Sequence, residues 1–112
     1  MTSVSAATAE VFERYRNIID AQQASGAEDP LAEDRYLSLK NLSWMCAQGA
    51  AESDRLPLDK ISRWLGCVQG CLGMRGLISI EAERDITRPL FHAAYAAEGI
   101  EIPGRRERAI EP

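Results

Sequence analysis

The sequence predicts an all-α fold, a compact bundle of four to five helices with a loose C-terminal tail. The first observation is the apolar periodicity of residues 61–72, where the apolar side chains recur at steps of three and four residues, as on one face of a helix. The second is the placement of Gly and Pro, which divides the chain into segments of helical length. The third is that no run rich in Val, Ile, Thr and aromatic residues lies between hairpin turns, and only 77–80 is a short apolar run that could pair as a strand.

The first two helices are predicted from their end signals. Residues 5–25 carry a narrow apolar stripe, with Ser5 as the expected N-cap and Gly26 as the stop. Asp29 followed by a proline is typical of an N-cap and a first helical residue, so we expect a second helix over 30–51. Because this segment is apolar around much of its circumference, we expect it to be the central helix.

The third helix has both of its ends marked by residue type. Pro57 suits a first helical position, where a missing N–H has no helical partner to lose. Gly76 suits the left-handed position just after a helix end. A short polar connection before Pro57 predicts that the second and third helices are antiparallel neighbours.

A proline divides the last helical pattern. Ser79 is the expected N-cap of a fourth helix, and Pro89 then falls inside the apolar repeat. We therefore expect a break near residues 87–88 and a fifth helix over 89–98. The predicted organisation is one helical domain over residues 1–99 and a flexible tail over 100–112.

Composition and charge limit the classes of function. The chain has 112 residues, of which 46% are hydrophobic and 27% charged, as in an ordinary globular domain. Its net charge of −4 is uneven, since residues 1–34 hold seven acidic and two basic side chains, a net of −5. Broad nucleic-acid binding needs clustered Lys and Arg, so nucleic acid is not the expected partner.

The expected location is the cytoplasm of the cell that makes or hosts the protein. No apolar run approaches the roughly 20 residues that span a bilayer, and the first residues lack the basic and then apolar pattern of a secretory signal. The three cysteines, Cys46, Cys67 and Cys71, are an odd number, which favours reduced thiols over a disulfide framework.

Small residues form a row along the third helix, and they predict a close helix contact. Ser62, Gly66, Gly70 and Gly73 fall along one side, although each helical glycine costs roughly 1 kcal/mol relative to alanine. The contacting helix could belong to the same chain or to a second copy. In the second case these four residues form the self-association surface of a homo-dimer.

Catalytic and metal chemistry find little support in the sequence. His92 is the only histidine, and Asp85 or Glu98 could assist it in acid–base catalysis, but a lone histidine on a helix is more often a packing residue. Neither a nucleophile elbow nor a phosphate-binding glycine loop is present. A zinc site of the three cysteines and His92 would need helical Cys spacing in place of the usual tight turn. The expectation is therefore no enzyme, no cofactor and no metal.

A DNA-binding regulator is a further alternative. A short turn before the third helix could present that helix to the major groove, with Lys60, Arg63, Gln69 and Arg75 as contacts. The missing basic patch argues against it.

Two stretches carry a resemblance. Residues 63–70, with the letters RWLGCVQG, and residues 83–92, with the letters ERDITRPLFH, resemble small helical proteins of bacteriophage and prophage genomes. The resemblance implies a phage accessory protein that binds a host or phage protein, including components of antiviral defence. It assigns no catalytic residue.

The prediction that follows is a non-enzymatic protein that works by binding, with inhibition of host antiviral defence as the role that the resemblance suggests. Small-ligand (nucleotide or anion) binding is the alternative. The predicted partner-binding residues are the polar positions of the two stretches, and arginines beside an aromatic and a histidine suit a carboxylate or phosphate group. They are Arg63, Gln69, Arg84, Arg88 and His92.

Overall fold

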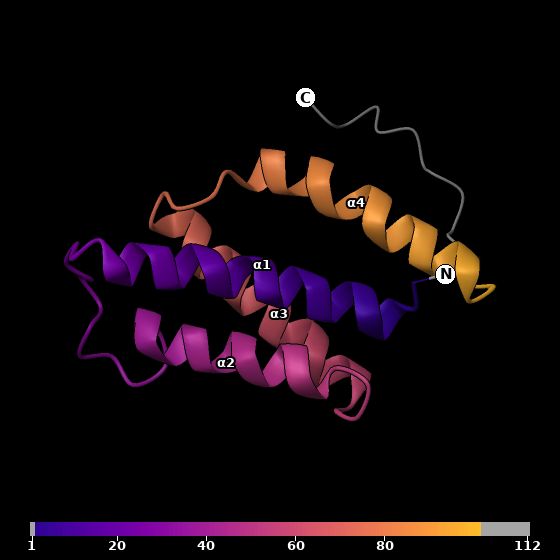
Figure 1. Ribbon diagram of the computed structural model, residues 1–112, viewed down its shortest axis with the longest axis horizontal. Coiled ribbons are helices and arrows are strands. Elements are labelled where there is room, and N and C mark those ends of the chain that lie inside the picture. The colour runs from indigo at the N-terminus through magenta and orange to yellow at the C-terminus, as the bar shows by residue number, and fades with distance from the viewer. Residues whose placement is uncertain (1, 102–112) are drawn as a thin grey trace.

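The computed structural model describes residues 2–101, and within them the chain is all-α with four helices (Figure 1). They are α1 (Val4–Ala24), α2 (Leu39–Glu52), α3 (Leu58–Met74) and α4 (Ile80–Ala97). The all-α fold class predicted from the sequence is confirmed. The predicted tail, residues 100–112, lies outside the described residues from 102 onward, and at its first residue the Ile100 N–H donates to the Tyr95 carbonyl at the end of α4.

Helix α1 is the central element of the bundle. Figure 1 shows it between α2 and α4, with α3 crossing behind it, and it packs against all three. Its buried face carries large apolar side chains at helical spacing, namely Val11, Phe12, Tyr15 and Ile19. The expectation that the second helix would be central is wrong, because α2 is shorter and leaves Trp44 half-exposed.

The helix ends follow the predicted chemistry with two corrections of position. Ser3, not Ser5, caps α1, and its hydroxyl accepts from the Ala6 N–H at 3.0 Å. Ser79 caps α4 as predicted, accepting from Ala82 at 3.3 Å. Pro57 is the N-cap of α3 and not its first residue. Gly76 follows α3 with a φ of +73°, the left-handed conformation that its position predicts.

The second helix begins nine residues later than predicted, at Leu39 and not at Pro30. Ser38 is its N-cap, accepting from the Asn41 N–H at 3.2 Å. The Asp29 carboxylate has other partners, because it accepts from the backbone N–H groups of Leu31 at 3.0 Å and of Leu39 at 2.8 Å. Residues 30–37 therefore form turns that lead to α2.

The predicted break at Pro89 is absent, and α4 is one continuous helix across it. A proline removes one backbone hydrogen bond and crowds the preceding turn, which disfavours an isolated helix there. Both halves of α4 are held by tertiary contacts, since Glu83 is buried before the proline and Ala94 after it. The predicted fifth helix is thus the second half of α4.

Candidate functional site

A buried polar cluster fixes the first half of α4 against the bundle. Glu83 is only 2% exposed, and its carboxylate pairs with the guanidinium of Arg14 from α1. Next to it, Gln69 of α3 donates from Nε2 to the Tyr15 hydroxyl at 2.9 Å. Burial raises the pKa of Tyr15 to about 12, and the nearby Glu83 charge acts in the same direction. Tyr15 is therefore a neutral hydroxyl, and the cluster links three helices.

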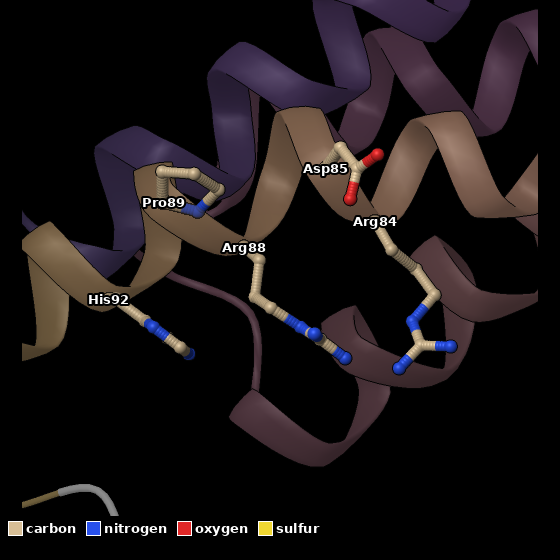
Figure 2. A pocket seen from close by; sticks show the side chains of 5 residues that line it. All are labelled: Arg84, Asp85, Arg88, Pro89 and His92. Carbon is tan, nitrogen blue, oxygen red and sulfur yellow. The ribbon is translucent and has the colours of Figure 1, made fainter. Parts of the chain in front are cut away.

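The anchored helix presents three of the predicted partner-binding residues together. Arg84, Arg88 and His92 are four residues apart, so they lie along one side of α4. We call these three residues the α4 basic row. With Asp85 and Pro89 they line a surface depression of about 320 Å³. Figure 2 shows the side chains of the row extending from the same side of the helix, with Asp85 and Pro89 on the other side.

The chemistry of the α4 basic row suits recognition of an anionic group. A guanidinium offers planar, paired N–H donors that match a carboxylate or a phosphate, and an imidazole adds a further donor. Arg84 already has an interaction within the protein. Among residues 2–101, neither Arg88 nor His92 takes part in a hydrogen bond or an ion pair, so their donors face solvent. Arg88 is thus the residue of the row that is most available to a partner.

The other two predicted partner-binding residues do not join this row. Gln69 is partly buried and its amide donates to Tyr15 of α1, so it lies apart from the α4 row and its role as a partner contact stays a prediction. The Tyr15 hydroxyl is buried and needs a hydrogen-bond partner, which Gln69 supplies. Arg63 is exposed on α3 and lies 3.5 Å from the Asp59 carboxylate one turn earlier, away from the α4 depression.

The predicted self-association residues divide into two groups. Gly66 and Gly70 are exposed, and a Cβ atom added at either would meet nothing within 4 Å. Ser62 is exposed as well. Gly73 differs, because an added Cβ would lie 2.9 Å from Cδ1 of Ile80. Close approach within the chain thus accounts for Gly73 and leaves the other three open to a partner.

The alternative zinc site is not assembled in the described part of the chain. Cys46 is fully buried in the core, whereas Cys67 is exposed on α3. Burial raises the pKa of the Cys46 thiol to about 12, which disfavours the thiolate that zinc requires. Residues 2–101 bring no three potential metal-ligating side chains together.

The alternative DNA-reading surface is also incomplete. Arg75 has a side chain only 9% exposed, and its Nη2 lies 3.1 Å from the Asp29 carboxylate. The same guanidinium donates to the Leu37 carbonyl, so it holds the 25–38 segment against the end of α3. With Gln69 also turned inward, two of the four proposed base contacts are occupied inside the protein.

A second hollow lies between α1, α3 and α4, and the sequence gives no sign of it. Its volume is about 490 Å³, and Leu58, Leu65, Phe91 and Tyr95 supply much of its lining. At the rim, the Glu98 carboxylate accepts from the Val4 N–H at 2.8 Å. A mostly apolar lining with a carboxylate at its edge does not favour a nucleotide or another anion.

Two contacts could not be predicted from the sequence, because each joins residues that are far apart in the chain. The Arg14–Glu83 pair joins residues 69 positions apart, and the Trp44–Trp64 contact joins two different helices. Local patterns do not show such partners. One signal was available, because Lys40 and Lys60 each precede a tryptophan by four residues.

Comparison of the chain with protein-family models, curated proteins and solved structures gave no significant match. The resemblance to helical phage proteins therefore stays a prediction. Within residues 2–101, no helix combines the length and the apolar character needed to cross a bilayer.

Proposed function

We propose that this chain is a non-enzymatic accessory protein that acts by binding another protein. The α4 basic row is the proposed contact surface, and a carboxylate or phosphate group on the partner is the group that it recognises. The observation that carries the proposal is Arg88, which lines the 320 Å³ depression and whose guanidinium pairs with nothing in residues 2–101. Arginine is enriched where interfaces derive most of their binding energy.

The proposed setting follows from the resemblance of residues 63–70 and 83–92 to phage proteins. The partner would be a host or phage protein in the cytoplasm of the host cell, and a component of antiviral defence is the first candidate. Because Arg84 and His92 flank Arg88 at one helical turn on either side, the row offers donors over about 12 Å of helix.

Partner capture from the producing cells tests this proposal. The tagged chain and its Arg88→Glu variant are compared, with Arg55→Glu as the matched control because Arg55 is 75% exposed and only pairs with Glu52 beside it. We expect the charge reversal at Arg88 to reduce the captured partner at least tenfold, since a cation would be replaced by a like charge. The control variant should capture as much as the unmodified chain.

Two outcomes would contradict the proposal. Equal capture by the Arg88→Glu variant, with its helical circular dichroism spectrum unchanged, would mean that another face makes the contact. Native mass spectrometry that shows a bound small anion, lost in Arg88→Glu, would favour the small-ligand alternative.

A further inference from the structure

The two tryptophans of the chain meet where α2 and α3 pack together, and neither lines the α4 depression. Trp44 of α2 and Trp64 of α3 have ring centroids 5.8 Å apart at an interplanar angle of 48°. Trp44 is 54% exposed, although its ring is one of the largest apolar groups in the protein. Trp64 is partly buried and packs against the core, whereas the large exposed ring of Trp44 beside it is typical of a contact surface.

The two lysines of the chain flank this aromatic pair. Lys40 precedes Trp44 by one helical turn, and Lys60 precedes Trp64 in the same way. Lys60 Nζ lies 5.4 Å from the Trp64 ring centroid, a cation–π arrangement. We call Lys40, Trp44, Lys60 and Trp64 the Trp–Lys face.

Each helix of the face carries one lysine, attached one turn before its tryptophan. Helix α3 runs back past α2 in roughly the opposite direction (Figure 1). The one-turn steps from Trp44 back to Lys40 and from Trp64 back to Lys60 therefore run in opposite directions along the two helices. Four residues of helix on each side correspond to a separation of about 12 Å along the helices. Within residues 2–101 neither lysine forms an ion pair with a carboxylate. The face is thus positive on a chain whose net charge is −4.

We propose that the Trp–Lys face binds an acidic amphipathic helix of a partner protein. In this complex a leucine-type side chain covers Trp44, and two carboxylates about 10 Å apart on the partner helix contact Lys40 and Lys60. The attraction of opposite charges fixes the register, and burial of the tryptophan supplies most of the affinity.

Charge favours an acidic helix at this face over two other occupants, a single-stranded nucleic acid and a second copy of the chain. A single-stranded nucleic acid needs a longer cationic track than two lysines, and the net negative charge of the chain repels its phosphates. A second copy docked symmetrically on the same face would bring like-charged lysines together across the two-fold axis.

This inference does not depend on the proposed function. The Trp–Lys face lies on α2 and α3, and none of its residues lines the α4 depression, so the face and the α4 basic row are different surfaces. If both are used, the protein joins two partners.

Intrinsic fluorescence tests the inference directly, because both tryptophans of the chain lie in the face. The probe is a blocked 15-residue alanine-rich helical peptide with glutamate at its fourth and eleventh positions, leucine at its eighth and no aromatic residue. The matched control peptide has glutamine in place of both glutamates. We expect the acidic peptide to shift the emission to shorter wavelength in a saturable titration, at least tenfold tighter than the control peptide.

Charge-reversal variants then test whether the peptide binds at the Trp–Lys face. Lys40→Glu and Lys60→Glu keep both tryptophans and change exposed side chains, and each should weaken the acidic peptide at least tenfold. Arg88→Glu, on the other surface, should leave the titration unchanged. Equal binding of the two peptides, or no shift at millimolar peptide, would overturn the inference. So would a shift produced by oligo-dT alone, or by raising the protein concentration without peptide.

Discussion

Asp29 determines, at the scale of single residues, how the segment between α1 and α2 folds. Its carboxylate accepts from two backbone N–H groups, those of Leu31 and Leu39, and pairs with the Arg75 guanidinium. Burial alone acts to raise the pKa of Asp29, but the hydrogen bonds from Leu39, Leu31 and Arg75 together outweigh it and lower the pKa below its ordinary value of 3.8.

The lowered pKa of Asp29 predicts a specific acid sensitivity. The native state holds the Asp29 proton less tightly than the unfolded state does, so the stabilisation is present above pH 3.8 and is lost as the pH falls through the lowered pKa. We expect Asp29→Asn to reduce the free energy of unfolding at pH 6 by about 1–3 kcal/mol. Below pH 4 the difference between the two proteins should shrink.

Urea denaturation followed by circular dichroism at pH 6 and at pH 3 measures this difference. Asp54→Asn is the matched control, because Asp54 is exposed in the connection between α2 and α3. A difference between Asp29→Asn and the unmodified chain that stays constant from pH 6 to pH 3 would show that the Asp29 charge does not stabilise the fold.

At the scale of elements, the helical glycines have opposite surroundings. Gly49 of α2 is buried, and an added Cβ would lie 2.5 Å from Cε2 of Phe12. Gly49 therefore permits α1 and α2 to approach closely, with the Phe12 ring in the place of a side chain. Gly66 and Gly70 of α3 have open space instead.

This contrast predicts opposite effects of the same substitution. Gly49→Ala should lower the free energy of unfolding by about 1–3 kcal/mol, because the Phe12 ring must move in a packed core. Gly66→Ala and Gly70→Ala should each raise it by about 0.5–1 kcal/mol through helix propensity. Thermal and urea unfolding at low protein concentration compares the three variants. A loss of stability in Gly70→Ala equal to that in Gly49→Ala would contradict the open environment of α3.

The helices also show how far the sequence predicts this fold. Periodicity and capping residues place α1, α3 and the start of α4 within one or two residues, because these signals act within a single turn. The start of α2 is missed because Asp29 bonds to Leu39 and Arg75, partners that are 10 and 46 residues away. The continuity of α4 is missed for a similar reason, since contacts on both sides of Pro89 override its local preference. For the candidate site, helical spacing alone groups Arg84, Arg88 and His92, whereas the inward turn of Gln69 depends on Tyr15.

At the scale of the whole molecule, α1 packs against both α2 and α4, and these two helices do not contact each other. Helix α2 packs on one part of α1 and α4 on another, and α3 contacts both of them. The Trp–Lys face lies where α2 meets α3, and the α4 basic row lies on α4. Helix α3 also carries a row of exposed residues at steps of four, and the first two of them line the 490 Å³ hollow. The row consists of Leu58, Ser62, Gly66, Gly70 and Met74.

That exposed row of α3 predicts self-association. Its large apolar members stand at the two ends, with Leu58 71% and Met74 90% exposed, and its small members lie between them. If two copies cross antiparallel at Gly66, the bare surface at Gly66 and Gly70 allows the two backbones to approach closely. Such a contact would offset the roughly 1 kcal/mol that each helical glycine costs.

We therefore expect a dimer in sedimentation velocity at micromolar concentration. Gly70→Glu should give a folded monomer, because a charged side chain would enter the seam, whereas Glu81→Gln on the exposed start of α4 should remain a dimer. A monomer for the unmodified chain at all concentrations up to 100 times higher would show that the row stays exposed to solvent.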